Sequence, residues 1–199
     1  IAGMRMIWVA GLAGVSAAGL FGAYLLVPHV AGRIRRFLNP ASGDTFQVDM
    51  AMEAFWNGGW FGLGPGEGIA KRSLPDSHTD FVFAVAAEEF GLLGVLVIVA
   101  GFLVLVLRSL RLARLAAGAA LPLHACLAAG FGVWLGLQAF INIGVNMGLL
   151  PTKGLTLPLM SYGRSSLVVT LAWVGMLLRI HHEVMATGRV ASTDAGGEA

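Results

Sequence analysis

Charged residues and cysteine are scarce in this sequence of 199 residues. Asp, Glu, Lys and Arg make up 12% of it, against about 25% in an average soluble protein. Hydrophobic residues make up 57%, so the composition excludes a soluble enzyme, and a disordered chain would be far less hydrophobic. The single cysteine, Cys126, excludes a disulfide scaffold, and a net charge of +2 gives no reason to expect nucleic acid as a partner. What remains is an integral membrane protein.

Long apolar stretches with few or no charges predict an all-α membrane domain with four transmembrane helices. At about 1.5 Å per residue, about 20 apolar residues cross a bilayer core of about 30 Å. The predicted spans are residues 6–30, 81–107, 121–147 and 161–180. The first two are joined by a loop over residues 31–80. Residues 184–199 lose the apolar periodicity and are expected to form a mobile cytoplasmic tail.

The connection between the second and third spans sets the predicted orientation. It carries Arg108, Arg111 and Arg114 without an acidic residue, and short basic loops stay in the cytoplasm. Four crossings then place both chain ends in the cytoplasm and the loops at residues 31–80 and 153–164 outside. The sequence begins with Ile rather than Met, so we expect a piece of a longer polypeptide.

The long outer loop contains two local signals. Apolar and acidic residues occupy opposite helical faces over residues 47–57, which predicts a short amphipathic helix at the interface. Its apolar face consists of Val48, Ala51, Met52 and Phe55. The glycine run at residues 62–68 lacks the Gly-Lys-Ser/Thr of a phosphate-binding loop. It predicts a turn whose glycines let the backbone approach a ligand or a neighbouring helix.

Asp80 lies where this outer loop meets the second span. The simplest explanation is an N-cap, because Asp accepts hydrogen bonds from free N–H groups at a helix start. The functional alternative is a general base at the membrane surface that takes a proton from a substrate hydroxyl. His78 would then be a hydrogen-bond partner or a metal ligand, although a lone histidine is more often neither.

Two further acidic residues, Glu88 and Glu89, are expected about two turns deeper in the second span. Intramembrane carboxylates are costly and usually face a cavity or a partner. On an ideal helix they project about 80° and 180° away from Asp80, so both cannot line one site with it. We therefore assign Glu88 to the candidate site and Glu89 to a structural pairing.

Polar side chains also mark the third span and the last outer loop. Gln138, Asn142 and Asn146 recur every four residues and form one stripe on a helix. Interhelical hydrogen bonding is slightly favoured for this stripe over the lining of a polar cavity. Lys153 and Arg164 are candidates to bind an anionic head group, and the alternative is that they simply extend toward the interface.

Several motifs resemble the SEDS family of bacterial shape, elongation, division and sporulation proteins. The resemblance extends from about residue 30 to residue 183 and is nearer to the division branch than to the elongation branch. The motifs are Gly58-Gly59-x-x-Gly62-x-Gly64, Leu74-Pro75, His78-Thr79-Asp80-Phe81, Glu88-Glu89-x-Gly91, Asn142-Ile143-Gly144-Val145 and Thr152-Lys153-Gly154-Leu155-Thr156-Leu157-Pro158.

The resemblance implies a peptidoglycan glycosyltransferase of the bacterial inner membrane that polymerises lipid II at the division septum. Asp80 matches the family's essential aspartate, which would deprotonate the 4-hydroxyl of the acceptor's N-acetylglucosamine. That oxygen would attack the anomeric carbon of the donor's N-acetylmuramic acid with inversion, and undecaprenyl diphosphate would leave. Family members have ten spans and this chain resembles the last four, so we expect the chain alone to be inactive.

The resemblance also implies a positive charge beside the leaving diphosphate. It further implies protein partners. A divalent cation, Mg²⁺ or Mn²⁺, or fixed cations would stabilise the diphosphate. Lys153 is the first candidate, and Lys71, Arg72 and Arg164 are weaker ones. Arg164 stands where the family usually has the second glycine of Ser-Tyr-Gly-Gly-Ser-Ser. The implied partners are a class B penicillin-binding transpeptidase and other divisome membrane proteins.

Two other functions are kept open. A lipid II flippase would need polar groups through the full depth of the membrane, and the polar stripe on the third span is compatible with this function. A scaffold that recruits a transpeptidase would need no carboxylate at the outer surface. The position of Asp80 at that surface, where the polymer is made, favours the enzyme.

Overall fold

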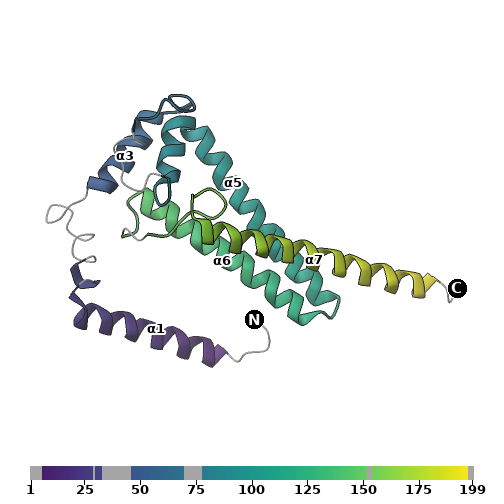
Figure 1. Cartoon of the computed structure of the whole chain (residues 1–199). Coiled ribbons are helices and arrows are strands. Elements are labelled where there is room, and N and C mark those ends of the chain that lie inside the picture. The colour runs from purple at the N-terminus through teal and green to yellow at the C-terminus, as the bar shows by residue number, and fades with distance from the viewer. Residues whose placement is uncertain (1–5, 29, 33–45, 70–77, 152–153, 197–199) are drawn as a thin grey trace.

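The computed structural model of the chain describes residues 6–28, 30–32, 46–69, 78–151 and 154–196. Its elements are helices (Figure 1), in the order α1 (Met6–Leu26), α3 (Phe46–Gly58), α5 (Val82–Gly118), α6 (Pro122–Asn146) and α7 (Arg164–Gly196). Three helical stretches are long and apolar enough to cross a membrane, namely Val82–Gly118, Pro122–Asn146 and Arg164–Thr187.

Helix α1 stands apart from the other described helices and contacts none of them (Figure 1). It falls within the first predicted span, but its apolar stretch Ala10–Leu26 is shorter than the other three. Large apolar side chains such as Leu12 and Val15 are exposed along it. Such a surface suits contact with lipid or with helices outside this chain.

Helix α5 does not run straight through the second predicted span, because it breaks at Gly91. This residue has φ 66° and ψ −168°, a backbone conformation that is essentially restricted to glycine. Figure 1 shows a short segment, residues 82–90, that meets the long segment, residues 92–118, at a sharp bend. The prediction of a continuous helix was wrong because the apolar pattern continues across the break.

The glycine-rich turn after α3 closes around this bend. Two of its N–H groups donate to the last carbonyls of the short segment, and two nearby carbonyls accept from the first N–H groups of the long segment. The bonds are Leu63 N to Glu88 O (2.9 Å), Gly64 N to Glu89 O (3.1 Å), Leu92 N to Gly59 O (2.9 Å) and Leu93 N to Trp60 O (3.2 Å). The turn thereby satisfies backbone groups that both helix ends leave open. Of the two predicted uses of these glycines, approach to a neighbouring helix is confirmed.

Helix α3 matches the short helix predicted over residues 47–57, but its buried face differs. Ala51, Ala54 and Gly58 are buried against α5, whereas Met52, which was assigned to the apolar face, is 37% exposed. The reason is close packing, because a Cβ at Gly58 would overlap the carbonyl oxygen of Ala87. Small residues let the two backbones meet, and a methionine would hold them apart.

Helices α5 and α7 both extend further than predicted, at the end of the bundle away from α3. Helix α5 continues to Gly118, so the three arginines at 108, 111 and 114 lie on a helix and the connection to α6 is short. Helix α7 continues to Gly196, so residues 184–196 are helical rather than a mobile tail. These stretches contain Ala, Leu and Arg, which are strong helix formers, and no proline.

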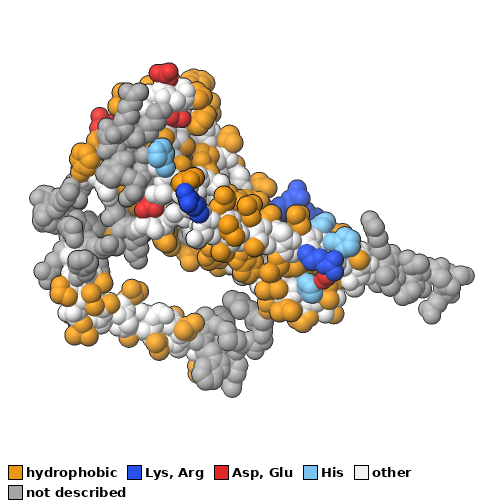
Figure 2. Space-filling model, viewed as in Figure 1, with side chains coloured by type: hydrophobic (Ala, Val, Ile, Leu, Met, Phe, Trp, Pro, Cys, Tyr) orange, Lys and Arg blue, Asp and Glu red, His pale blue; other side chains and the backbone are white. Residues whose placement is uncertain are grey.

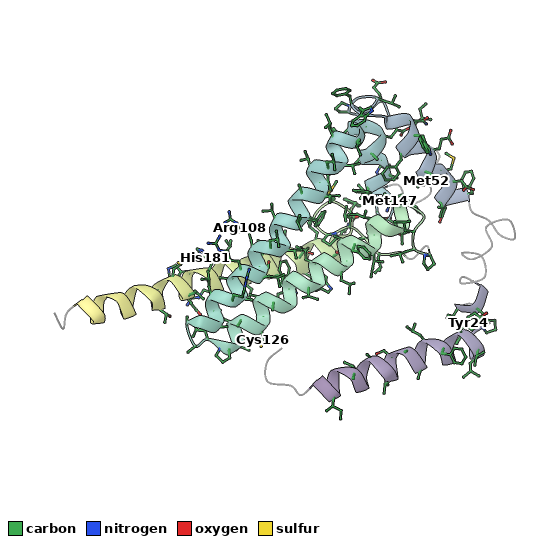
Figure 3. All side chains as sticks on the ribbon, turned by 180° about the vertical axis from the view of Figure 1, so that it is seen from behind. Tyr24, Met52, Arg108, Cys126, Met147 and His181 are labelled. Carbon is green, nitrogen blue, oxygen red and sulfur yellow. The ribbon has the colours of Figure 1, made fainter. Side chains whose placement is uncertain are left out.

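The two ends of the helical bundle differ in charge. Figure 2 shows Arg and His side chains gathered where α5, α6 and α7 lie together, away from α3. Figure 3 places Arg108, Cys126 and His181 at this end and Met52 and Met147 at the other. Within the basic end the carboxylate of one α7 glutamate joins two helices. Glu183 lies 2.6 Å from His124 Nε2 on α6 and 2.6 Å from Arg179 Nε on α7. The basic end is the one that the predicted orientation places in the cytoplasm.

The core lies between α5, α6 and α7. One buried cluster consists of Phe83, Phe102, Phe131, Leu135, Ala139 and Leu157, and another, nearer the basic end, consists of Leu112, Ala113, Ala116, Ala128, Ile180 and Val184. Phe131 stacks on Trp173 of α7 with the ring centroids 5.7 Å apart. Helix α6 approaches α5 closely at Gly132, where a Cβ would lie 3.0 Å from Ser109 Cβ. Leu157 reaches this core from the last outer loop and anchors that loop to the bundle.

Truncation of Leu135 tests this packing. Leu135 is fully buried and Leu137, on the same helix, is 56% exposed. Leu135→Ala should lower the free energy of unfolding by about 2 kcal/mol, the lower end of the range for buried leucines, because lipid tails are as apolar as leucine and the transfer contribution is small. Leu137→Ala is the matched control. Equal unfolding temperatures of the two full-length variants in detergent would contradict the described core.

Candidate functional site

Asp80 immediately precedes the first turn of α5 and is half-buried. The N-cap of the helix is Phe81, and no side chain caps the helix start. Asp80 therefore does not occupy the N-cap position, which was the simplest explanation of this residue. A half-buried carboxylate at this place is reachable from the surface.

Two asparagines of α6 hold the backbone of Asp80. Asn142 Nδ2 donates to the Asp80 carbonyl at 3.0 Å, and Asn146 Nδ2 donates to the same carbonyl at 2.9 Å. Asn146 Oδ1 also accepts from the N–H of Ala84 at 3.1 Å. Both asparagines are almost completely buried, with 2% and 0% of their surface exposed. The base of the short segment is thus tied to α6 through side-chain amides.

The same stripe of α6 also holds the last outer loop. Asn142 Nδ2 donates to Leu155 O at 2.5 Å and Gln138 Nε2 donates to Thr156 O at 3.0 Å. These three amides therefore bond to backbone carbonyls of non-helical segments. The favoured reading of the stripe as hydrogen bonding is confirmed: Asn146 bonds to an N–H of α5, and the other partners described here are carbonyls of the outer loops.

Ser161 fastens the two outer segments to each other. Its Oγ donates to Thr79 O at 2.5 Å and accepts from Leu157 N at 2.6 Å. One residue on, Tyr162 N donates to His78 O at 2.9 Å. Residues 78–80 and 154–162 therefore form one unit over the end of α6. No pattern in the sequence indicated this role for a single serine.

Gly154 brings the last outer loop to the carboxylate of Asp80. A Cβ on Gly154 would lie 3.2 Å from Asp80 Oδ2. The preceding residue is Lys153, the first-ranked predicted cation, which lies outside the described residues. Of this predicted pair, the structure therefore places Gly154 beside the Asp80 carboxylate.

The other predicted site residues are distributed unevenly. His78 is exposed and shares the outer unit with Asp80 through its backbone. Arg164 is exposed at the start of α7, where its guanidinium lies 5.9 Å from the Tyr162 ring centroid. Backbone φ at 164 is not left-handed, so the replaced family glycine strains nothing there. Lys71 and Arg72 lie outside the described residues.

Glu88 is not near Asp80. The prediction placed it about two turns deeper in the second span than Asp80, and the structure does not. It is completely buried, and a Cβ on Gly68 would lie 2.6 Å from its Oε2. Seven residues of helix separate Glu88 from Phe81, about 10 Å along the axis. Because α5 turns back at Gly91, Glu88 and Glu89 lie at the bend, beside the outer turn, and not deeper in the bundle than Asp80. Glu88 therefore belongs to the turn around the bend.

The described residues offer little to hold a divalent cation by themselves. Among them, no three His, Cys, Asp or Glu side chains lie together as metal ligands. A Mg²⁺ or Mn²⁺ ion at Asp80 would have to take most of its ligands from the phosphates of a bound lipid and from water. The described side chains alone would therefore not hold such an ion.

Removal of the Ser161 hydroxyl tests the unit formed by the two outer segments. Ser161→Ala leaves the buried N–H of Leu157 without its partner, which costs about 1–3 kcal/mol. Ser165→Ala, at an exposed position nearby, is the control and should leave stability unchanged. Thermal unfolding of the two full-length variants in detergent measures the difference. A Ser161→Ala variant as stable as the control would show that Ser161 does not hold the two outer segments together.

Three apolar helices are long enough to cross a membrane, which defines the class as polytopic membrane proteins. Non-helical segments gather around Asp80 at one end of the bundle. The chain belongs to the cell cycle protein family of FtsW, RodA and SpoVE, whose sequence model matches residues 1–186. The resemblance stated from the motifs is thereby confirmed.

Curated relatives share close to half of their aligned residues with this chain. It is 46% identical over 192 residues to the "Probable peptidoglycan glycosyltransferase FtsW" of Thioalkalivibrio sulfidiphilus, covering 94% of this chain and 48% of the relative. It is 45% identical over 180 residues to the protein of the same name from Caulobacter vibrioides, covering 90% and 45%. The chain spans about half the length of the curated relatives it matches.

Two solved structures are similar in fold. A chain from a structure described as "Structural coordination of polymerization and crosslinking by a peptidoglycan synthase complex" has a TM-score of 0.64 and 31% identity, covering 89% of this chain and 50% of that one. A mutant of the rod shape-determining protein RodA of Thermus thermophilus has a TM-score of 0.54 and 31% identity, covering 92% and 59%.

Proposed function

We propose that the protein to which this chain belongs polymerises lipid II into glycan strands, with Asp80 as the general base. The observation that carries the proposal is the anchoring of Asp80. Its backbone is fixed by two buried amides while its side chain is half-exposed beside the loop of Gly154. A fixed, reachable carboxylate is what general-base catalysis at a membrane surface needs. The names of the curated relatives support a peptidoglycan glycosyltransferase.

The proposed reaction is a single inverting displacement. Asp80 takes the proton of the 4-hydroxyl of the acceptor's N-acetylglucosamine, and that oxygen attacks the anomeric carbon of the donor's N-acetylmuramic acid. The bond to undecaprenyl diphosphate breaks, and the diphosphate leaves with the electron pair. An activated leaving group needs no acid, so one carboxylate suffices, in contrast to the carboxylate pair of glycosidases. We assign the charge of the leaving diphosphate to Lys153, next to Gly154, with Lys71, Arg72 and Arg164 as further candidates.

The place and partners of the reaction are part of the same proposal. The basic end of the bundle would face the cytoplasm, and Asp80 would face the outer side of the bacterial inner membrane. One structural relative comes from a complex that coordinates polymerisation with crosslinking, which supports a penicillin-binding transpeptidase as partner. We place the activity at the division septum on the similarity to FtsW. The curated relatives are about twice as long as this chain, and the part that this chain does not match would complete the substrate cavity, so this chain alone would be inactive.

The contacts of the α6 stripe weigh against a flippase. A transport path needs polar groups free to meet the passing head group through the depth of the membrane. The amides of Gln138, Asn142 and Asn146 instead bond to loop carbonyls near the Asp80 end. A scaffold protein that catalyses no reaction would not need an aspartate held in this way.

A reconstitution distinguishes these functions. The full-length parent, purified with its transpeptidase partner, is incubated with labelled lipid II in detergent, where no membrane separates two compartments. We expect moenomycin-insensitive glycan strands that require Asp80. A flippase or scaffold would yield no polymer in this mixture, and that result would overturn the proposal.

A further inference from the structure

We propose that Asn142 and Asn146 are positioning residues that set the place of Asp80 relative to the loop of Gly154. The inference rests on the proposed function, because it gives these asparagines a role toward the base of that reaction. They touch the backbone of Asp80 and act through it.

Asn146 decides where α5 begins. In a regular helix the N–H of Ala84 would donate to the carbonyl of Asp80, four residues earlier. Here the carboxamide of Asn146 stands between them, accepting from Ala84 N at 3.1 Å and donating to Asp80 O at 2.9 Å. Asp80 therefore remains outside the helix, and its backbone orientation is set from α6.

Asn142 joins Asp80 to the opposite loop. Its Nδ2 donates to Asp80 O at 3.0 Å and to Leu155 O at 2.5 Å. A single side chain thus bonds to both non-helical segments at the position of Asp80. The residue before Leu155 is Gly154, where a Cβ would lie 3.2 Å from Asp80 Oδ2. A shift of either segment would change the surroundings of the carboxylate directly.

The partners of these amides separate a positioning role from simple helix association. Polar side chains that hold membrane helices together bond across helix interfaces. Asn146 does bond to an N–H of α5, that of Ala84, but both asparagines also bond to the carbonyl of Asp80, and Asn142 bonds to a carbonyl of the facing loop. The bonds converge on one acidic residue at the end of the bundle.

Steady-state kinetics of the full-length protein with its partner give the first test. A misplacement of about 1 Å can cost about 100-fold in rate, so Asn142→Leu and Asn146→Leu should lower kcat for lipid II polymerisation about 100-fold with little change in KM. The matched control is Gln138→Leu, which removes an amide of the same stripe that bonds to Thr156 rather than Asp80. We expect a much smaller loss there. Unchanged kcat in both asparagine variants would overturn the inference.

A disulfide cross-link gives a second test that needs no activity. We expect the thiols of the double variant D80C and G154C to reach each other, because a Cβ on Gly154 would lie 3.2 Å from Asp80 Oδ2. The variant is made in a full-length parent whose other cysteines, including Cys126, are replaced by serine. Mild oxidation should close the bridge efficiently. Adding Asn142→Leu, or the smaller change Asn142→Ser, should lower its yield several-fold while the unfolding temperature stays near that of the double variant.

The two tests separate the inference from the proposed function. An unchanged cross-link yield in folded Asn142→Leu and Asn142→Ser proteins would overturn the positioning role, whatever Asp80 does chemically. A parental rate of polymerisation in Asp80→Asn would overturn the proposed base. The cross-link yield would still decide whether Asn142 sets the distance between the two segments.

Discussion

Asp80→Asn in the full-length protein should lower the rate of glycan polymerisation by about 100- to 10,000-fold, the contribution of a positioned general base. The amide keeps the size of the carboxylate and removes its capacity to accept the proton of the acceptor hydroxyl. The backbone carbonyl that Asn142 and Asn146 hold is unaffected, so the fold should persist. Asp80→Ala should lose a similar amount. The measurement is the initial rate of lipid II conversion by the purified protein with its transpeptidase partner.

Asp49→Asn is the matched control for this experiment. Asp49 is an exposed acidic residue on α3, in the same outer region of the chain. Its loss changes the charge by the same amount at a residue that is not among the described partners of either asparagine or of the Asp80 carbonyl. We expect the parental rate. Equal losses in both variants would indicate a general effect of outer negative charge and would remove Asp80 from the chemistry.

Gly91→Ala should have the largest effect on stability. A Cβ on Gly91 would lie 2.6 Å from the carbonyl oxygen of Trp60, and the residue has φ 66°. The strained backbone alone costs about 1–3 kcal/mol, and relief of the clash would open the turn that completes both helix ends. We expect the free energy of unfolding to fall by about 3 kcal/mol or more, with low yield of folded protein.

Gly101→Ala provides the comparison on the same helix. Nothing lies within 4 Å of a Cβ at Gly101, and alanine is about 1 kcal/mol better than glycine in a helix interior. Gly101→Ala should therefore be neutral or slightly stabilising in thermal unfolding of the full-length protein in detergent. A Gly91→Ala variant with the same midpoint as Gly101→Ala would show that α5 does not bend at Gly91.

The helices that carry a composition or periodicity signal could be predicted from the sequence. Charge-free stretches located α5, α6 and α7, and alternating faces located α3 to within a residue of each end. The bend at Gly91 could not be read in this way, because apolar residues continue on both sides of it. What fixes the bend is the pairing of Gly91 with a turn that lies about 30 residues earlier. A single sequence carries no signal for that pairing.

The candidate site could be predicted only in part, because the sequence shows patterns along the chain but no contacts between distant residues. Asp80 was found because acidic residues are rare in this chain, and the amides of α6 were found because they repeat every four residues. Their meeting at the Asp80 carbonyl is a long-range contact that neither pattern contains. Glu88 was misplaced because angles on an ideal helix assume that α5 continues beyond the break. Ser161 was overlooked because an isolated serine has no distinguishing pattern.

Binding and turnover measured on the same Asp80→Asn protein test the central claim most directly. Full-length Asp80→Asn protein with its partner is saturated with labelled lipid II, and bound lipid and polymer are then quantified over time. The account predicts that the variant binds lipid II about as well as the parent and forms almost no polymer. Conversion of the bound lipid into glycan strands at the parental rate would contradict the assignment of Asp80 as the base.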